Sequence, residues 1–266
     1  MRERTAVGYT AAGGRNMRRC LVAGNWKMHG TPAETESFIV RFLPLVRSSS
    51  AEVVLFPPFT SLDRAGRLLR EAGVELGAQD VYFEPKGAFT GAVSPGMLAA
   101  CGCRYVLVGH SERRHVFGDG DAIVRRKLDA SIAGGIDPVL CVGETIAERR
   151  GRQTSLVLET QLEAGLSGQS PEAIARIVIA YEPVWAIGTG ETATPEQVQE
   201  ASAWIREWVG RHHGRAAATV RILYGGSVKL DNARSLLALP DVDGALVGGA
   251  SLDPEGFAAL VAAAEA

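Results

Sequence analysis

Eight short apolar segments alternate along this chain with longer amphipathic segments. The short segments place β-branched and other apolar residues at consecutive positions, which is typical of strands buried on both faces. We therefore predict strands at residues 21–26, 52–56, 74–78, 105–109, 138–142, 177–181, 220–224 and 245–247. The longer segments predict helices at residues 32–47, at 61–72, from about 94 onward, and at 121–133, 155–166, 195–211, 232–239 and 253–264.

Regular alternation predicts a parallel α/β sheet, because parallel strands need crossover helices between them. Eight units are the number that closes into a (β/α)8 barrel. The competing architecture, an open doubly wound sheet, would normally carry a G-x-G-x-x-G turn after its first strand. Here that strand ends in Asn25-Trp26-Lys27-Met28, and no linker or shift in composition follows. We therefore predict a single barrel domain over residues 17–266.

The composition excludes several classes of function. A formal net charge of -2 and a pI near 6.2 do not indicate a protein that binds nucleic acid or a membrane surface. The longest apolar runs are far shorter than a membrane span. The four cysteines show no pairing pattern and suit a reducing compartment, so we expect a cytoplasmic protein. Cys101 and Cys103 form half of a metal-binding spacing, but no second Cys or His pair completes it, and we expect no metal.

The first sixteen residues have no hydrophobic periodicity and no apolar signal-peptide core. We expect residues 1–16 to be a disordered N-terminal extension, or the product of a start upstream of Met17. Arg2, Arg4 and Arg15 leave a transit peptide as an alternative, although Glu3 and the absence of an amphipathic face speak against it.

Functional groups on such a barrel are expected at the carboxyl ends of the strands, where the loops converge. Polar side chains follow three predicted strands there: Asn25 and Lys27 after the first, His110, Ser111 and Glu112 after the fourth, and Glu182 after the sixth. Pro183 restricts Glu182 to an extended conformation and ends its strand. The sequence therefore predicts a carboxylate base, an imidazole, an amide and an ammonium group in one space.

The seventh and eighth predicted strands each end in a glycine turn, Gly225-Gly226-Ser227 and Gly248-Gly249. A single pair of glycines usually marks only a tight turn. Two pairs at adjacent strand ends expose backbone N–H groups at the usual phosphate position of a barrel, with Ser227 and Lys27 available nearby. We therefore predict phosphate binding.

Two of these residues have alternative interpretations. Lys27 would be a Schiff-base lysine if burial or another cation lowered its pKa, but carboxylates are also at hand, and we interpret it as a fixed positive charge. His110 would be a structural histidine if it stood alone. Its position among Ser, Glu and Arg at a strand end favours a catalytic role.

An apolar loop follows Glu182 and precedes the helix that opens at residues 194–196. Val184, Trp185 and Ile187 are apolar although they lie in a loop, and glycines follow them. This pattern predicts a flap that closes over a ligand and excludes water. The alternative is an ordinary loop that packs against a neighbouring subunit.

A carboxylate base, a neutral imidazole and a phosphate site together indicate proton transfer next to a carbonyl group. In this interpretation Glu182 takes a proton from carbon. His110 and Lys27 stabilise the charge that moves to oxygen, and no cofactor is needed.

The chain resembles the triosephosphate isomerase family, whose fold is the TIM barrel. The resemblance rests on motifs at residues 22–28 (VAGNWKM), 87–91 (GAFTG), 108–114 (VGHSERR), 138–145 (PVLCVGET), 180–190 (AYEPVWAIGTG), 223–228 (LYGGSV) and 243–252 (DGALVGGASL). These motifs keep their order and extend over nearly the whole chain.

The resemblance implies a reaction of glycolysis and gluconeogenesis, the interconversion of dihydroxyacetone phosphate and D-glyceraldehyde 3-phosphate. Glu182 would move a proton between two carbons through an enediolate, and neutral His110 would shuttle the hydroxyl protons. Lys27 and Asn25 would polarise the substrate, supported by Ser111 and Glu112. The phosphate would be bound by backbone N–H groups of Gly188, Ser227, Gly248 and Gly249. Residues 184–193 would form the lid.

The family is usually homodimeric, with the loop at residues 79–92 entering the partner's site, where Thr90 would touch Asn25 and Glu112. Two departures lie in this loop: Ala92 replaces the usual glutamate, and Asp80 stands where asparagine is frequent. Loss of the glutamate removes a partner for Arg113, which would weaken the interface or shift its register.

Two rival functions differ from this reading. A paralogous isomerase of a tetrulose phosphate would keep the same base and phosphate site, so only the length of the pocket would distinguish it. A catalytically silent barrel used for binding predicts the loss of Glu182, His110 or Lys27, and all three are present.

Overall fold

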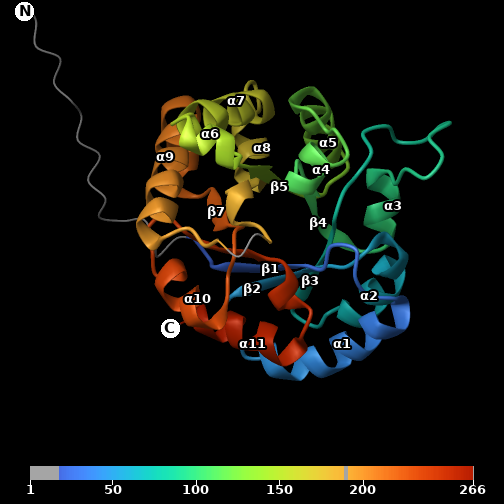
Figure 1. The fold of residues 1–266 in the computed structure, drawn as a ribbon. Coiled ribbons are helices and arrows are strands. Elements are labelled where there is room, and N and C mark those ends of the chain that lie inside the picture. Colours follow the sequence, from blue (N-terminus) through green and yellow to red (C-terminus); the bar gives the residue numbers. More distant parts are fainter. Residues whose placement is uncertain (1–17, 189–190, 266) are drawn as a thin grey trace, which may run out of the picture.

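The computed structural model describes residues 18–188 and 191–265. The predicted disordered extension at residues 1–16 lies outside these ranges. Within them, eight parallel strands close into one barrel in chain order, and helices surround it (Figure 1). The strands are β1 (Leu21–Asn25), β2 (Glu52–Phe56), β3 (Val74–Ala78), β4 (Cys103–Val108), β5 (Asp137–Val142), β6 (Val178–Tyr181), β7 (Arg221–Tyr224) and β8 (Gly244–Val247).

Pairing between the first and last strands closes the barrel. Leu21 lies opposite Gly244, and this register continues to Gly24 opposite Val247. A Cβ atom on Gly244 would lie 1.9 Å from the carbonyl oxygen of Leu21, so only glycine permits this approach. The predicted barrel is therefore confirmed, and the doubly wound sheet is wrong.

The consecutive apolar residues of each strand serve two cores. Alternate side chains such as Val54, Phe56, Leu107 and Ala180 fill the inside of the barrel. Their neighbours in the sequence, such as Val53 and Val106, pack outward against the helices. Burial on both faces explains why these strands lack the polar alternation of a solvent-facing sheet.

Eight helices of the described residues correspond to the predicted ones and follow the strand-helix alternation. They are α1 (Pro32–Val46), α2 (Leu62–Leu69), α3 (Pro95–Ala100), α5 (Asp121–Ala133), α7 (Thr154–Leu166), α9 (Pro195–His213), α10 (Leu230–Leu237) and α11 (Pro254–Ala263). Several of them begin with proline after a capping side chain, as α1 does at Thr31-Pro32 and α9 at Thr194-Pro195. Proline lacks an N–H group that the first helical turn leaves unbonded in any case.

The structure also contains short elements that the sequence analysis did not predict. These are α4 (Ser111–His115), α6 (Ile146–Arg150) and α8 (Pro171–Arg176), with 3-10 turns η2 (Phe59–Ser61), η3 (Val184–Ala186), η4 (Gly214–Ala218) and η5 (Gly249–Ser251). Several predicted ends were also wrong by one to three residues: β4 begins at Cys103, and α2 ends at Leu69. One or two helical turns are too short to show a hydrophobic period.

Candidate active site

The predicted residues meet at the carboxyl edge of the barrel. Asn25 ends β1, Glu182 follows β6, and Gly248 follows β8. These three line one cavity of about 380 Å³ together with the predicted residues Lys27, His110, Gly188, Ser227 and Gly249. Eight of the predicted site residues therefore share one space, although they come from segments more than 200 positions apart.

Glu182 is only 2% exposed, and two contacts hold its carboxylate in place. Its Oε2 atom accepts a hydrogen bond from the backbone N–H of Ser111 at 2.9 Å, and its Oε1 atom lies 3.2 Å from Nε2 of His110. A Cβ atom on Gly225 would lie 2.7 Å from Cγ of Glu182, and one on Gly143 would lie 1.9 Å from its carbonyl oxygen. Both neighbours must therefore be glycine for this carboxylate to fit.

Hydrogen bonds assign the tautomer of His110. Its Nδ1 atom accepts the backbone N–H of Glu112 at 3.3 Å, so in the neutral ring the proton resides on Nε2. Nε2 faces Oε1 of Glu182 and lies 3.2 Å from Nδ2 of Asn25. A neutral imidazole with its N–H directed to the cavity can donate a hydrogen bond to a substrate oxygen.

Lys27 has a left-handed backbone conformation, with φ of 52°. Such a conformation is costly for a lysine and persists only where the surroundings enforce it. Its N–H donates to Oδ1 of Asn25 at 3.0 Å, and its carbonyl oxygen accepts from Nε2 of Gln79 at 2.8 Å. Its Nζ atom is 2.6 Å from Oε1 of Glu112. The ammonium group therefore has a defined position at the cavity.

The glycine turns at residues 225–227 and 248–249 also line the cavity. Gly248 and Gly249 precede and open the short turn η5, and a Cβ atom on Gly249 would meet nothing within 4 Å. The backbone at Gly249 is therefore open to an approaching ligand. Lys229 lines the same cavity as Ser227. Together with Lys27 it makes this end of the cavity suitable for an anion.

Three predicted residues lie outside the cavity. Ser111 and Glu112 contact residues that line the cavity: Ser111 is bonded to Glu182, and Glu112 is bonded to Lys27. Thr90 is exposed and does not line the cavity. It belongs to the long loop between β3 and α3, which projects from the barrel (Figure 1). The structure of one chain therefore does not bring Thr90 together with the other site residues.

Two polar residues at the site were not predicted as site residues. Lys229 lines the cavity and directly follows the motif LYGGSV, so its position next to a phosphate loop was the available signal. Gln79 donates to the carbonyl oxygens of both Lys27 and Phe56 at 2.8 Å. Its only signal was its place just beyond a strand end, which does not indicate a partner.

The loop after Glu182 is anchored at its first turn. Trp185 in η3 is 8% exposed, and its Nε1 atom donates to Oε1 of Glu144 at 3.0 Å. Glu144 is fully buried and also accepts from Arg149 at 3.0 Å and from the hydroxyl of Tyr181. Ile187 then lines the cavity. The predicted lid at residues 184–193 includes two residues, 189 and 190, outside the described ranges.

Cys141 lies buried next to the site. Burial, followed by the charge of Glu182, raises the pKa of its thiol well above the usual value. The thiol therefore stays neutral at physiological pH and adds no charge beside Glu182. Within residues 18–188 and 191–265, no three His, Cys, Asp or Glu side chains gather as a metal site requires.

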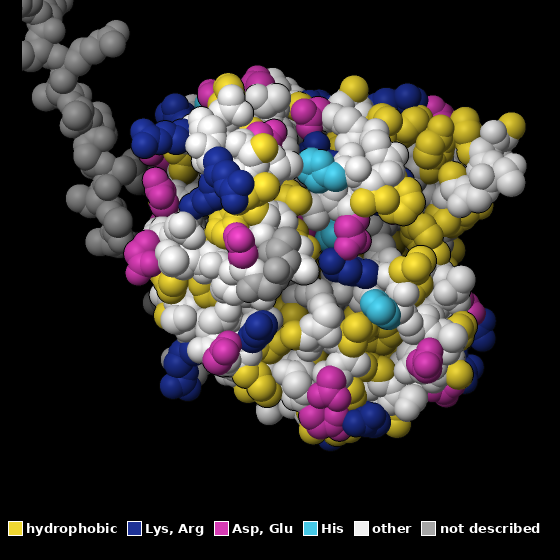
Figure 2. All heavy atoms as spheres, in the orientation of Figure 1, with side chains coloured by type: hydrophobic (Ala, Val, Ile, Leu, Met, Phe, Trp, Pro, Cys, Tyr) yellow, Lys and Arg dark blue, Asp and Glu magenta, His cyan; other side chains and the backbone are white. Residues whose placement is uncertain are grey.

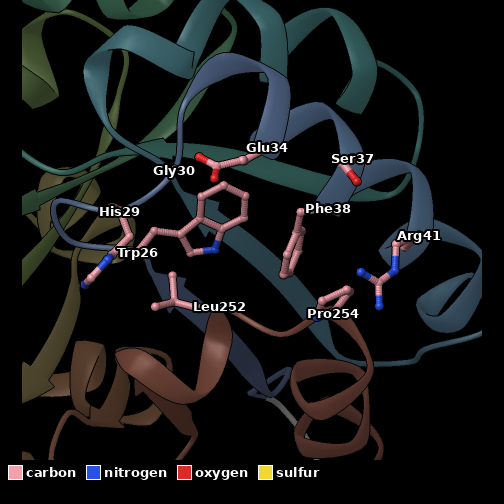
Figure 3. A pocket seen from close by; sticks show the side chains of 9 residues that line it. All are labelled: Trp26, His29, Gly30, Glu34, Ser37, Phe38, Arg41, Leu252 and Pro254. Atoms are coloured by element: carbon pink, nitrogen blue, oxygen red, sulfur yellow. The ribbon is translucent and has the colours of Figure 1, made fainter.

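A second cavity of about 400 Å³ is lined by Trp26 and by residues of α1 and the start of α11 (Figure 3). Its lining includes the charged residues Glu34 and Arg41. Glu34 is bonded to Thr31 at the start of α1, and Arg41 forms an ion pair with Glu255. This cavity therefore does not offer the free positive charge that an anionic substrate would need.

The described helices are all too short or too polar to cross a bilayer.

Comparison with known proteins agrees with the motifs. The family model for triosephosphate isomerase matches residues 20–264. The triosephosphate isomerase of Geobacter metallireducens is 50% identical over 247 residues, covering 92% of this chain and 98% of that protein. Those of Moorella thermoacetica and Roseiflexus castenholzii are 50% and 51% identical, again over 92% of this chain and over 98% and 97% of their own lengths. The chain belongs to the triosephosphate isomerase family.

Proposed function

We propose that this protein is an intramolecular aldose-ketose isomerase that interconverts dihydroxyacetone phosphate and D-glyceraldehyde 3-phosphate. One observation carries the proposal: Glu182 and His110 are in contact, at 3.2 Å, beside a cavity that the glycine turns also line. Proton transfer next to a carbonyl needs a base and an oxygen-stabilising donor on one small substrate, and this pair supplies both.

The catalytic roles follow from the contacts. Glu182 removes a proton from carbon 1 of the ketose, and the electron pair moves to the oxygen on carbon 2 to give an enediolate. The Nε2 proton of His110 and the charge of Lys27 stabilise this oxygen, and Oδ1 of Asn25 holds the backbone of Lys27. His110 moves the hydroxyl proton from the oxygen on carbon 1 to the oxygen on carbon 2. Glu182 returns a proton to carbon 2 as the carbonyl forms at carbon 1, which completes the isomerisation without a cofactor.

We assign the phosphate of the substrate to the backbone N–H groups of Gly188, Ser227, Gly248 and Gly249. These residues line the cavity, and Lys229 adds a positive charge near Ser227. Residues 184–193 are the proposed lid, which keeps the enediolate from water until it is reprotonated. Ser111 and Glu112 support Glu182 and Lys27 from outside the cavity.

We further propose that the working form is a homodimer. Hydrophobic side chains gather on the side of the molecule where the loop between β3 and α3 projects (Figure 2). Met28 is 94% exposed and Val116 is 73% exposed, and Phe117 and Phe89 add aromatic surface. Thr90 of one subunit would then reach Asn25 and Glu112 of the other. Sedimentation equilibrium should give twice the mass of one chain, and a single-chain mass at micromolar concentration would reject this arrangement.

Steady-state kinetics test the proposed activity. The purified protein should isomerise dihydroxyacetone phosphate and D-glyceraldehyde 3-phosphate in both directions, and much faster than a four-carbon tetrulose phosphate. A preference for the four-carbon substrate would favour the paralogous isomerase, since base and phosphate site would be the same. Absence of turnover on either substrate would reject the proposal. The cysteines suggest a reducing compartment, and we propose that the protein acts in the cytoplasm.

A further inference from the structure

Four charged side chains form a compact cluster at the start of the loop between β3 and α3. Lys127 of α5 is 2% exposed, and its Nζ atom lies 2.6 Å from Oδ1 of Asp80 and 2.6 Å from Oδ2 of Asp119. Arg113 of α4 contacts the same two carboxylates, Asp119 at 3.0 Å and Asp80 at 3.3 Å. Each cation is therefore bonded to both anions. We call these residues the four-charge cluster.

The cluster is electrically balanced only because residue 80 is an aspartate. Two cations face two carboxylates, and buried charges are tolerated when they are paired in this way. Burial would raise the pKa of Asp119, but hydrogen bonds from Arg113 and Lys127 outweigh this effect and lower it. With an uncharged asparagine at position 80, the two cations would share Asp119 alone. Asp80 therefore neutralises a buried lysine.

The second departure in the same loop is explained by the first. Ala92 lacks the glutamate that the family resemblance makes usual there, and we expected this loss to remove a partner for Arg113. Arg113 has other partners within the chain, because it is bonded to Asp80 and Asp119 and lies 4.4 Å from the ring centre of Phe117. The negative charge that is missing at Ala92 is present at Asp80, at the start of the loop instead of near its end.

The cluster is connected to the site from two sides. Asp80 directly follows Gln79, whose amide holds the carbonyl oxygen of Lys27. Arg113 belongs to α4, the helix that His110 caps. Ser111 and Glu112 of this helix bond to Glu182 and Lys27. The position of α4 therefore determines where the groups around the cavity lie.

We propose that Asp80 is a positioning residue for the isomerase reaction: it replaces the carboxylate missing at Ala92 and fixes α4, and with it His110 and the pair of Lys27 and Glu112. The inference rests on the proposed function of the same site. All four cluster residues belong to one chain, so this charge balance is complete within one subunit.

Asp80→Asn tests the proposal, since it removes the charge but keeps the shape of the side chain. Active sites are counted by titration with a tight phosphate-bearing inhibitor, so that loss of folded protein does not lower the measured kcat. We expect kcat per site to fall about 10-fold to 100-fold, since a misplacement of about 1 Å costs on the order of 10²-fold. The control is Asp63→Asn in the exposed pair of Asp63 and Arg67, which should leave kcat unchanged.

The double variant Asp80→Asn with Ala92→Glu provides the readout that a purely structural role would not move. It restores a carboxylate at the usual position, and we expect it to recover most of the lost kcat. The inference is overturned if Asp80→Asn keeps kcat within about twofold of the parent chain, or if the double variant is no faster than Asp80→Asn. If Asp80→Asn alone does not fold, the double variant must fold and be active, and its failure to do so overturns the inference. A parent chain without isomerase activity would instead reject the proposed function.

Discussion

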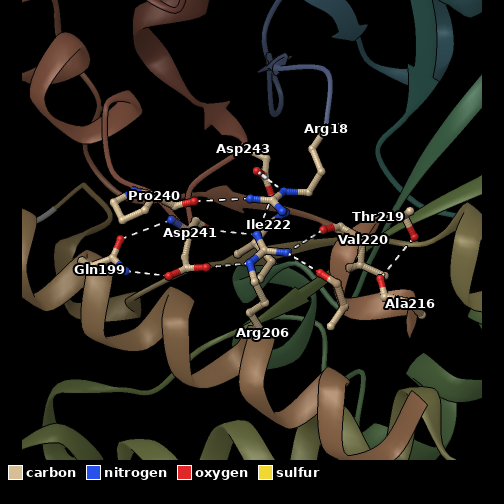
Figure 4. Close-up of polar contacts among 11 residues, drawn as sticks. Arg18, Gln199, Arg206, Ala216, Thr219, Val220, Ile222, Pro240, Asp241 and Asp243 are labelled. Atoms are coloured by element: carbon tan, nitrogen blue, oxygen red, sulfur yellow. Dashed lines mark hydrogen bonds and ion pairs between the residues drawn. The ribbon is translucent and has the colours of Figure 1, made fainter. Parts of the chain in front are cut away.

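The two ends of the barrel use buried charges in different ways. At the amino end of the strands, Asp243 accepts hydrogen bonds from Arg18 and Arg206, each at 2.6 Å, and from the backbone N–H of Ile222 at 2.9 Å (Figure 4). Nearby, Glu52 accepts from Arg221 at 2.6 Å and from the hydroxyl of Tyr105 at 2.7 Å. Both oxygens of each carboxylate are therefore bonded by groups of the chain itself.

At the carboxyl end, the polar groups are bonded on one side and face the cavity on the other. Glu182 is bonded by Ser111, and His110 by Glu112, yet both line the cavity. Lys27 there keeps a costly left-handed backbone. The difference shows that pairing at the amino end contributes stability, whereas the carboxyl end retains strain and open hydrogen-bonding positions for a substrate. Substitutions at the two ends should therefore separate activity from stability.

Glu182→Asp should have the largest effect. The shorter side chain draws the carboxylate back by one methylene, and kcat should fall by about 10² to 10⁴-fold, the range that a positioned base contributes. The free energy of unfolding should change little, and a phosphate-bearing inhibitor should still bind. Steady-state kinetics and inhibitor titration measure these quantities. Unchanged turnover would show that Glu182 is not the base.

Asp243→Asn should show the opposite behaviour at the amino end. It leaves two arginines beside an uncharged group, and breaking a buried ion pair costs about 3–5 kcal/mol of the free energy of unfolding. The kcat per folded molecule should be unchanged. Urea unfolding gives the first quantity and active-site titration the second. Glu255→Gln in an exposed pair is the matched control, with no measurable loss of stability expected. A large fall in kcat would contradict the proposed separation.

Gly225→Ala should lower activity with a smaller change in stability. The added Cβ atom would lie 2.7 Å from Cγ of Glu182, so the base must move. We expect kcat to fall about 10-fold to 100-fold, since small misplacements of catalytic groups have effects of this order. Gly96→Ala is the control, because its Cβ atom would have no neighbour closer than 4.0 Å. Equal kinetics for the two variants would mean that Gly225 does not determine the position of Glu182.

The smallest predicted effect concerns acid stability. Burial would raise the pKa of Glu52, but hydrogen bonding from Tyr105 and the charge of Arg221 prevail and lower it. A lowered pKa in the folded state means that the stabilisation is present above the usual carboxyl pKa of about 4.3 and is lost as the pH falls through the folded value. The difference in unfolding free energy between the parent and Glu52→Gln should therefore be largest near neutral pH and shrink below about pH 4. A constant difference from pH 7 to pH 3 would contradict this assignment.

The sequence predicted those features that depend on residues close together in the chain. Buried strands were visible from consecutive apolar residues, and the position of Glu182 followed from Pro183. The cluster of charges at the carboxyl edge followed from the rule that parallel strands end on the same side. The resemblance to a known family supplied the individual roles of these residues.

Contacts between distant residues could not be predicted. The bond from Gln79 to Lys27 spans 52 positions, and that from Arg221 to Glu52 spans 169. No local pattern specifies such partners, because they depend on how the whole barrel closes. The partners of Arg113 could not be predicted for the same reason: Asp80 was noted only as a departure from the family pattern, and its contacts with Arg113 and Lys127 appear only in the fold.

The most direct test of the account is the isomerisation of dihydroxyacetone phosphate in deuterium oxide. If Glu182 carries the proton between two carbons, the parent chain should form glyceraldehyde 3-phosphate with deuterium at carbon 2, detected by NMR. Glu182→Gln should abolish both turnover and deuterium incorporation while inhibitor binding persists. Incorporation at the parent rate by the Glu182→Gln variant would contradict the central claim that this carboxylate is the base.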